Sequence, residues 1–201
     1  MIRRAVDVAV AAVALVVAAP LLALAALAIR LETRGPAIYR QRRVGLDGAE
    51  FDVLKLRTMV DGAERIGAGL AVDAGDPRVT RVGALLRRSS LDELPNLWNV
   101  LRGEMSLIGP RPTVPSQVAR YTERQRRRLE IRPGLTGWAQ VNGRAALPWS
   151  ERIELDIYYV EHRSLALDLR ILARTLRVLA GGGGVYRGAT GGWDGPSSPD
   201  Q

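Results

Sequence analysis

Residues Arg87 to Pro112 read RRSSLDELPNLWNVLRGEMSLIGPRP, and this stretch decides the interpretation of the chain. Ser90 and Glu93 have the Ser-x-x-Glu spacing of a capping box before an apolar helical run. Asp92 and Glu93 then lie in the first helical turn, where unpaired backbone N–H groups and the helix dipole favour negative charge. Pro95 interrupts this pattern. The alternative is a regular helix that begins at Pro95, with both acids on a tight turn before it.

An Asp-Glu pair at a helix start has two interpretations. In the commoner one, Glu93 caps the helix and Asp92 is a solvated surface acid. In the other, Asp92 stays ionised and acts as a nucleophile or as a metal ligand. The pair alone does not separate these interpretations, so the choice depends on the rest of the chain.

The composition restricts the chemistry. The 201 residues carry a net charge of +8 with a pI of about 10.8, so phosphates, acidic lipids or nucleic acid are expected partners. There is no cysteine and one histidine, His162, which excludes thiolate chemistry and His-rich metal sites. A bound metal would take mainly oxygen ligands, as Mg²⁺ does. Lys55 is the only lysine among 29 basic residues, and a compact ammonium differs from a guanidinium at a phosphate.

A hydrophobic segment occupies residues 1–30. Residues 8–29 contain no charged side chain, and as a helix they rise about 33 Å, enough to cross the hydrocarbon core. Pro20 lies near the middle, where it breaks or kinks a helix. Arginines flank both ends, so the positive-inside rule gives no orientation, whereas a re-entrant hairpin keeps both flanks cytoplasmic. A spanning and a re-entrant helix both stay open at this point.

Residues 31–180 are expected to form a small, mostly helical α+β domain. Ala37 to Tyr39 and Glu50 to Leu56 are the predicted strands of a short hairpin, with residues 45–48 as its turn. Lys55 and Arg57 then point to the same face, as a solvated edge or a phosphate clamp. The other predicted elements are helices over residues 61–71, 79–88, 118–131, 149–160 and 165–179 and a strand over residues 138–141.

Two of these helices have surfaces that suit a membrane. Residues 118–131 carry a dense arginine run at Arg124 and residues 126–128, which is usually solvated but also binds acidic headgroups beside a membrane segment. Residues 165–179 place leucines on one face, which packs on the core or lies in the bilayer interface. Residues 181–201 are rich in Gly, Ser and Pro and are predicted to be a disordered tail.

The arginines beside Pro- and Gly-fixed turns suit a multiply anionic ligand, because guanidinium forks bind phosphate oxygens in pairs. A nearby carboxylate that also binds Mg²⁺ is able to attack phosphorus once the metal and the arginines have drawn charge from the phosphoryl oxygens. Aspartyl-phosphate ATPases use such an acyl-phosphate. Glycosidase chemistry fits less well, because it places its carboxylates on opposite sides of a sugar.

Several long motifs occur in one order: KLRTM (Lys55 to Met59), DPRVTRVGALLRRSSLDELPNLWNVLRGEMSLIGPRP (Asp76 to Pro112), RPGLTGWAQVNGR (Arg132 to Arg144) and LDIYYVEHRSLALDLRIL (Leu155 to Leu172). Through them the chain resembles the small bacterial sugar transferases, the monotopic polyprenyl-phosphate phosphoglycosyl transferases, up to about Leu179. The resemblance implies an enzyme of the bacterial inner membrane with its catalytic domain on the cytoplasmic face. It would move a phosphosugar from a UDP-sugar to undecaprenyl phosphate, release UMP and initiate polysaccharide or glycoconjugate assembly, for example of an exopolysaccharide.

The resemblance also assigns site residues. The nucleophile of the family falls on Asp92, which forms a covalent phosphosugar intermediate and belongs to the Mg²⁺ site. The supporting glutamate falls on Glu93. Asp156 and Asp168 lie in matched motifs and are expected in structural ion pairs. Motif position and charge make five residues the candidates for binding substrate phosphates: Lys55, Arg57, Arg87, Arg111 and Arg144.

The N-terminal segment of the family is a re-entrant helix that breaks at a Ser-Pro pair. Here the pair is Ala19-Pro20, so the proline matches and the serine does not. Pro20 still supplies the steric break, but no serine hydroxyl is present to satisfy the freed carbonyl groups.

The expected partners are a UDP-sugar, undecaprenyl phosphate and membrane lipids, without nucleic acid, and a homodimer is compatible with the resemblance. Two other classes stay open. A non-catalytic anchor for acidic lipid or nucleic acid predicts that Asp92→Asn changes little and that affinity falls steeply with salt. A phosphohydrolase predicts sustained UMP release without lipid phosphate, whereas a ping-pong transferase stops after about one turnover without its acceptor. The sugar is not determined by the sequence.

Overall fold

The computed structural model describes residues 2–66, 72, 75–143 and 146–181. Three predictions fall outside this range. They concern Arg144, residues 182–201, and residues 67–71 of the helix expected over residues 61–71. The elements are, in order, α1 (Ile2–Glu32), β1 (Ile38–Val44), η1 (Leu46–Gly48), β2 (Glu50–Leu56), η2 (Ala63–Arg65), α2 (Arg81–Arg88), η3 (Leu91–Glu93), α3 (Asn96–Arg102), β3 (Ser106–Ile108), α4 (Pro115–Val118), α5 (Glu123–Arg126), η4 (Arg127–Leu129), β4 (Gly134–Thr136), α6 (Trp138–Val141), α7 (Trp149–Glu161) and α8 (Leu165–Gly181). The chain is thus a mixture of helices and small sheets with one long apolar helix at its N-terminus.

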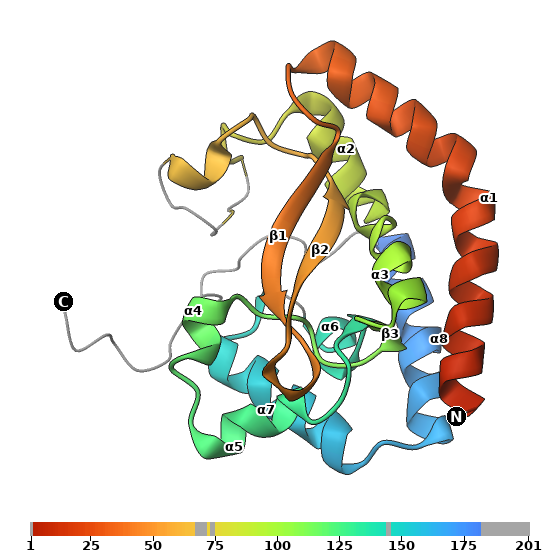
Figure 1. Ribbon diagram of the computed structural model, residues 1–201, viewed down its shortest axis with the longest axis vertical. Coiled ribbons are helices and arrows are strands. Elements are labelled where there is room, and N and C mark those ends of the chain that lie inside the picture. Colours follow the sequence, from red (N-terminus) through yellow and green to blue (C-terminus); the bar gives the residue numbers. More distant parts are fainter. Residues whose placement is uncertain (1, 67–71, 73–74, 144–145, 182–201) are drawn as a thin grey trace.

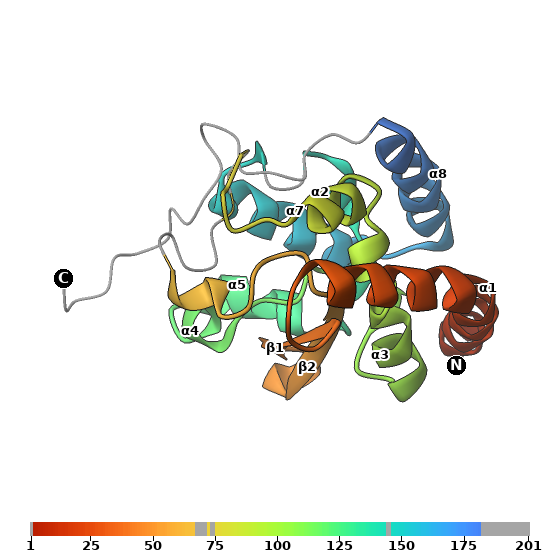
Figure 2. The same cartoon turned by 90° about the horizontal axis from the view of Figure 1, so that it is seen from above.

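The long helix α1 lies along one edge of the molecule (Figure 1). Viewed from above, it passes between α8 on one side and α3 with the hairpin on the other (Figure 2). Only a narrow stripe of α1 is buried, at Ala11, Ala25 and Ile29. Pro20 lies inside α1, which continues on both sides of it, and Figure 1 shows that the helix changes direction along its length. The helix is therefore bent but continuous, so a full break at Pro20 is not found.

The hairpin of β1 and β2 is antiparallel, with Arg43 opposite Phe51 and Tyr39 opposite Lys55. Its second strand has the predicted bounds, whereas the first extends five residues beyond Tyr39 to Val44. The buried positions of β2 are Phe51, Val53 and Leu56. Since side chains alternate along a strand, Lys55 shares the inner face with Phe51 and Val53.

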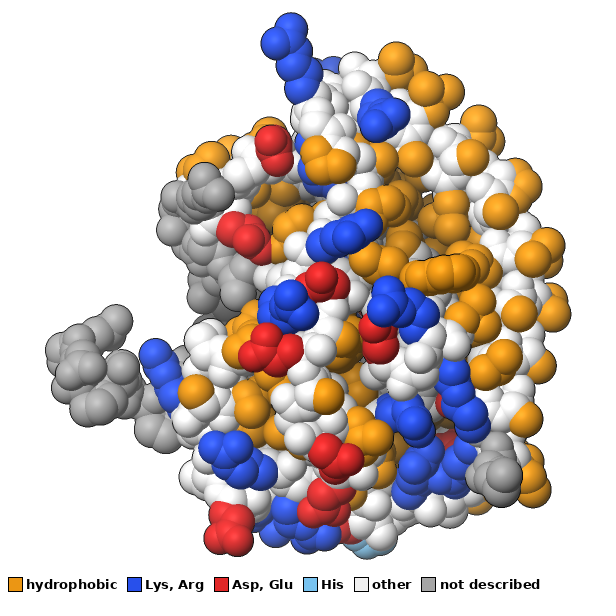
Figure 3. Space-filling model, in the orientation of Figure 1, with side chains coloured by type: hydrophobic (Ala, Val, Ile, Leu, Met, Phe, Trp, Pro, Cys, Tyr) orange, Lys and Arg blue, Asp and Glu red, His pale blue; other side chains and the backbone are white. Residues whose placement is uncertain are grey.

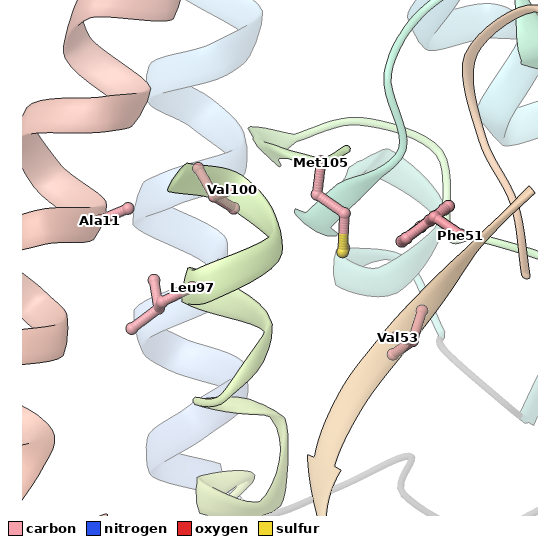
Figure 4. Packing of buried hydrophobic residues seen from close by; sticks show 6 residues of the cluster. All are labelled: Ala11, Phe51, Val53, Leu97, Val100 and Met105. Atoms are coloured by element: carbon pink, nitrogen blue, oxygen red, sulfur yellow. The ribbon is translucent and has the colours of Figure 1, made fainter. Parts of the chain in front are cut away.

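The hydrophobic cluster in Figure 4 connects α1 to the hairpin through α3. Ala11 of α1 faces Leu97 and Val100 of α3, and Met105 extends toward Phe51 and Val53 of β2. Polar contacts fix the same packing, because the Asn96 and Asn99 side chains both accept from the backbone N–H of Leu54, at 3.1 and 3.3 Å. The first turn of α3 is therefore held against β2.

A second, parallel pair of strands, β3 and β4, was not predicted. Ser106 pairs with Gly134 and Ile108 with Thr136. The backbones approach so closely here that a Cβ on Gly109 would lie 2.4 Å from the carbonyl oxygen of Arg132. A glycine is therefore needed at Gly109, and this contact fixes the start of the Gly-Pro-Arg-Pro turn that carries Arg111.

Three secondary-structure predictions are wrong. In the helix expected over residues 61–71, the described residues 61–66 form a turn and the short 3-10 helix η2, because Gly62 has a left-handed backbone with φ 73°. The helix expected over residues 118–131 is divided into α4, α5 and η4, with Thr122 forming a capping box that starts α5. The strand expected over residues 138–141 is the short helix α6. In contrast, helices α2, α7 and α8 agree with the predictions over residues 79–88, 149–160 and 165–179 within two residues at each end.

Candidate active site

The two adjacent acids lie on the short 3-10 turn η3 between α2 and α3. Ser90 has a left-handed backbone with φ 56° and ψ 18°, and its side chain does not cap the turn. The predicted capping box is therefore wrong. α3 instead begins after Pro95, its N-cap residue, because proline has a fixed φ that suits a helix start and needs no hydrogen-bond partner for its nitrogen. The alternative, with both acids on a tight turn before this helix, is correct, and the helix begins one residue later than the Pro95 start expected there.

Glu93 is fixed by two cations that meet on one of its oxygens. Lys55 Nζ lies 2.8 Å from Glu93 Oε1, and Arg111 Nη2 lies 2.7 Å from the same atom. Burial acts to raise the pKa of Glu93, but Arg111 and Lys55 outweigh it and hold this pKa well below its usual range. Burial also lowers the pKa of Lys55, an effect that Glu93 opposes. Glu93 is therefore ionised, and it positions both cations.

Asp92 has a different environment. Within the described ranges its carboxylate makes no hydrogen bond or salt bridge, although Lys55, Arg87 and Arg111 are all among its electrostatic neighbours. Burial, together with the charge of Glu93, raises the pKa of Asp92 to about 6. At neutral pH this side chain is thus an ionised, partly buried carboxylate to which none of the described cations is bound. Such a group is a better nucleophile than one held in an ion pair.

The structure brings together some of the other predicted phosphate-binding residues and not all of them. Lys55 and Arg111 contact Glu93, and Arg87 lies near Asp92 with its Nε donating to Thr58 Oγ1 at 2.7 Å. Arg57 does not join them. It is buried and donates to the Thr33 carbonyl and hydroxyl at 2.9 and 3.0 Å, which ties β2 to the end of α1. Lys55 and Arg57 therefore do not form the expected clamp, because β2 ends at Leu56 between them.

A cleft opens beside Glu93, and one of its cations was not predicted. Arg43 of β1 lines this cleft together with Lys55, Glu93 and Arg111. The predicted first strand ended at Tyr39, so Arg43 was not assigned to either face of the hairpin. An alternating pattern continued to Val44 would have placed Arg43 on the inner side of the hairpin, where Lys55 lies.

A buried network holds the turn that carries Arg111. Arg128 donates from Nη2 to the Arg111 carbonyl at 2.8 Å and to the Asp156 carboxylate. Its Nη1 donates to Thr113 Oγ1 at 2.7 Å and to the Tyr121 hydroxyl at 2.6 Å. The Arg128 and Asp156 side chains are only 5% and 2% exposed. The expectation of a structural ion pair at Asp156 is confirmed, and the pair supports the backbone of a site residue.

The arginine run of residues 124–128 is not an open basic face. Arg124 pairs with Glu154 at 2.6 Å. Arg127 pairs with Glu130 at 3.3 Å and with Glu161, and Arg128 is buried. Three of its four arginines therefore have carboxylate partners, which removes most of the charge that would attract headgroups.

The described residues contain no group of three or more His, Asp or Glu side chains placed to hold a metal ion. Asp92 and Glu93 provide two adjacent carboxylates, and Glu93 is already bound to two cations. Mg²⁺ is commonly held by one or two carboxylates together with water and substrate phosphates. The donor set at Asp92 fits an ion that arrives with, or is completed by, a phosphate ligand.

The model of the bacterial sugar transferase family matches residues 1–182 of this chain. The chain belongs to this family. The match covers α1, the η3 turn with its two acids and all the elements that support it. The resemblance to these phosphoglycosyl transferases is thereby confirmed, and the protein is an enzyme of this transferase class.

The chain is also similar to several named proteins. The chain is 49% identical over 185 residues to a UDP-glucose:undecaprenyl-phosphate glucose-1-phosphate transferase of Caulobacter vibrioides, covering 87% of this chain and 68% of the relative. It is 42% identical over 190 residues to an Aeromonas hydrophila UDP-N-acetylgalactosamine-undecaprenyl-phosphate N-acetylgalactosaminephosphotransferase, covering 92% and 45%. It is 37% identical over 198 residues to the exopolysaccharide production protein ExoY of Sinorhizobium fredii, covering 92% and 88%. The first two relatives differ in their sugar, so similarity does not select a donor.

Proposed function

We propose that this protein transfers a phosphosugar from a UDP-sugar to undecaprenyl phosphate through a covalent intermediate on Asp92, with release of UMP. The observation that carries the proposal is the division of labour between the adjacent acids. Glu93 holds Lys55 and Arg111 at hydrogen-bond distance, while Asp92 is left without a bound cation among the described residues. One acid thus organises phosphate-binding groups, and the other is available to attack.

In the first step, a carboxylate oxygen of Asp92 forms a bond to the sugar-bearing phosphorus. The bond from that phosphorus to the bridging oxygen breaks, and its electron pair leaves on UMP. Arg87 and Arg111 are electrostatic neighbours of Asp92, and they would stabilise the charge on the phosphoryl oxygens. In the second step, an oxygen of undecaprenyl phosphate attacks the same phosphorus and displaces Asp92 as a free carboxylate.

Mg²⁺ is the proposed cofactor, and Asp92 is the residue that would hold it, together with donor phosphate oxygens. When bound, the ion would supply further positive charge beside those oxygens. Glu93 keeps Lys55 and Arg111 in place. Burial of the turn raises the pKa of Asp92 only to about 6, so most of this carboxyl is ionised at neutral pH. No separate base is then needed to activate the nucleophile at neutral pH.

The polar contacts at the two ends of α1 support a re-entrant arrangement. At its start, Arg4 donates to the Val100 carbonyl at 2.6 Å, and Asp7 accepts from the Ser106 hydroxyl at 2.6 Å. At its end, Glu32 accepts from the backbone N–H of Arg81 at 2.8 Å. Both ends of the apolar helix are thus bound to the domain that carries Asp92. A helix crossing the bilayer would separate its two ends by the full hydrocarbon thickness of about 30 Å.

The expected ion pair of Asp168 also holds the start of α1. Asp168 of α8 lies 3.1 Å from Arg3 and accepts from the Tyr159 hydroxyl at 2.7 Å. We propose that α1 enters and leaves the membrane on the cytoplasmic face, with the bend seen in Figure 1 at its deepest part. The anchoring contacts at both ends supply stability that a serine before Pro20 would otherwise contribute.

Apolar side chains mark the surface that would face lipid. Figure 3 shows an apolar border along α1, whereas charged side chains gather over the hairpin and the lower half of this face. α8 adds exposed leucines at Leu165, Leu169 and Leu176, the last 70% exposed. An amphipathic helix with such a face lies in the bilayer interface. The proposed site would therefore lie close to the headgroups, where the phosphate of the acceptor lipid is found.

The proposal is tested by UMP release from protein in lipid nanodiscs with Mg²⁺, undecaprenyl phosphate and a panel of UDP-sugars. Wild type, Asp92→Asn and Asp61→Asn are compared. Asp61 is an exposed acid on the loop after β2 and serves as the matched control. We expect sustained release that requires the lipid, with one preferred donor, in wild type and Asp61→Asn only. Full activity of Asp92→Asn, or sustained release without lipid phosphate, would contradict the proposal.

A further inference from the structure

Arg43 lines the cleft but has no role in the two transfer steps described above. β1 alternates strictly, with Tyr39, Gln41 and Arg43 partly buried and Arg40 and Arg42 exposed. Arg43 therefore points toward the cleft, where Lys55 and Arg111 also lie. The backbone N–H of Val44 donates to the Thr113 carbonyl at 2.8 Å, which holds this end of β1 against the Arg111 turn. The position of Arg43 is thus fixed by the fold.

The charge in this cleft is not balanced. Its lining contains three cations, Arg43, Lys55 and Arg111, and one carboxylate, Glu93. Glu93 contacts only the last two cations. Arg43 instead donates to neutral acceptors, the Pro112 carbonyl at 3.3 Å and the Gln41 side chain, and it forms no salt bridge within the described part of the chain. Several of its five N–H donors stay available to a ligand.

Contacts order the cations along the cleft. Asp92 adjoins Glu93 in the chain, and Glu93 holds Arg111 and Lys55 at 2.7 and 2.8 Å. Arg43 contacts neither acid in the described part of the chain and donates instead to the carbonyl of Pro112, the residue after Arg111, at 3.3 Å. Arg43 and Arg111 line the cleft, whereas Asp92 does not. A diphosphate has two phosphates in a row, and Arg111 and Arg43 supply a cation to each of them.

We propose that Arg43 binds the nucleotide phosphate of the UDP-sugar, the phosphate that leaves as part of UMP. This inference rests on the proposed function, which places the sugar-bearing phosphate at Asp92. When the bridging bond breaks, negative charge develops on the oxygen that leaves with UMP. A guanidinium next to that phosphate, on the side of Arg111 away from Asp92, binds the donor and stabilises this charge.

The pKa of Arg43 is compatible with this role. Burial, and then the charge of Arg111, lower it to about 10, so the side chain is still protonated at neutral pH. The two guanidiniums repel each other in the free protein. A phosphate between them would relieve this repulsion, which gives the nucleotide a reason to bind at this point.

The test is UMP and uridine binding to full-length protein in detergent, measured by calorimetry for wild type, Arg43→Gln and Arg42→Gln. Arg42 is the matched control, because it is the adjacent residue on the outer face and pairs with Asp52 at 3.3 Å. A hydrogen bond to a charged group contributes roughly 1.5–3 kcal/mol, which corresponds to about 10- to 100-fold in affinity. We expect this loss for UMP with Arg43→Gln, no loss with Arg42→Gln, and unchanged uridine binding in both.

UMP affinity of Arg43→Gln equal to that of Arg42→Gln would overturn the inference, as would an equal loss of uridine binding, which indicates a distorted site. Arg43→Lys is the second variant in case Arg43→Gln does not fold. It keeps the charge and loses the planar fork, so we expect a smaller loss in the same direction. The proposed function is judged separately, because it fails if wild type transfers no phosphosugar, whatever UMP binding shows.

Discussion

Two acid–arginine clusters of this protein use the same residue types in opposite ways. At the η3 turn, Asp92 and Glu93 face Lys55 and Arg111 beside a cleft, and the Arg111 side chain is 50% exposed. At the second cluster, Asp156 and Arg128 are buried, one acid faces one base, and the guanidinium is also bound by a carbonyl and two hydroxyls. The cluster at the η3 turn lies beside a cleft with more cations than carboxylates and is accessible to a ligand. The cluster of Arg128 and Asp156 is buried and is not accessible.

The difference teaches how to separate a site from a support. Burial raises the pKa of Asp156 to about 6 in spite of Arg128, whereas Asp156 and Tyr121 raise the pKa of Arg128 in spite of its burial, so the cost of burial and the gain from the ion pair oppose each other. Buried pairs are often of this kind. The second cluster is therefore explained by the position it gives the Arg111 backbone and not by a contribution to stability. The first is explained by the anion it attracts.

The largest expected effect separates the two acids that share a pKa of about 6. Asp92→Asn should lower transfer by at least about 10³-fold, because removing a nucleophile abolishes the covalent route. Asp156→Asn should lower it far less, since Asp156 touches no substrate. Initial rates of UMP release at saturating donor and acceptor measure both. Equal losses in the two variants would show that the clusters do not differ in kind.

Glu93→Gln should lower kcat by about 10²- to 10³-fold, the range for removing one preorganised electrostatic contact. The amide keeps the size of the side chain but no longer neutralises Lys55 and Arg111, which then shift apart. Glu104→Gln is the control, because Glu104 is a partly buried acid that pairs with Arg102 at 3.2 Å. If the Glu93→Gln variant has rates close to those of the control, Glu93 does not have the proposed role in positioning Lys55 and Arg111.

Replacing the closed cluster by apolar residues should separate activity from stability. Arg128→Met with Asp156→Leu should change the free energy of unfolding by less than about 1 kcal/mol or raise it, as for other buried pairs. Transfer should fall about 10- to 100-fold, because the Arg111 turn loses its support and small displacements at a site have effects of this size. Chemical denaturation and UMP release are the two measurements. Stability and activity that are both unchanged would refute a positioning role.

The pH dependence should come from Asp92. Its pKa of about 6 in the folded protein makes kcat/KM fall about tenfold per pH unit below that value, because only the carboxylate attacks. The folded state holds the Asp92 proton more tightly than the unfolded state does. The free energy of unfolding thus decreases as pH rises through the range between about 4 and 6. Asp92→Asn should therefore be more stable than wild type at pH 8, by up to about 3 kcal/mol, and no more stable at pH 4.

The smallest effect is expected at a surface pair. Arg124 and Glu154 contact each other at 2.6 Å, but both are more than half exposed. Exposed pairs contribute less than about 1 kcal/mol. Arg124→Ala should leave transfer unchanged and shift the denaturation midpoint only slightly. A large loss of transfer would show that the arginine run of residues 124–128 has a role beyond the buried contacts of Arg128.

Much of the site could be predicted because its residues are close in sequence or lie in recognisable motifs. Asp92, Glu93 and Arg111 fall within one stretch of 26 residues, and the proline that starts α3 could be recognised from its backbone restriction. Arg43 was missed because strand ends are set by pairing across the hairpin, which a single strand does not reveal. Arg57 was wrongly placed beside Lys55, because β2 ends at Leu56 and the side chain of Arg57 contacts Thr33 instead.

The remaining errors come from contacts between distant residues. The arginine run looked basic because Glu154, Glu161 and Asp156, which neutralise it, lie about 30 residues further along the chain. The strand expected at residues 138–141 is a helix because α7 and α8 pack against it, with Trp138 and Val141 in the same cluster as Tyr159 and Ile171. Local propensity does not contain this information.

The central claim is that Asp92 carries the phosphosugar between the two steps. The most direct test is to incubate the full-length protein with Mg²⁺ and its preferred UDP-sugar, without undecaprenyl phosphate, and to quantify UMP while locating the adduct by peptide mass spectrometry. The account predicts a burst of about one UMP per protein and a phosphosugar on the peptide that contains Asp92, both absent in Asp92→Asn. Continued UMP release without an adduct, or an adduct on another residue, would contradict it.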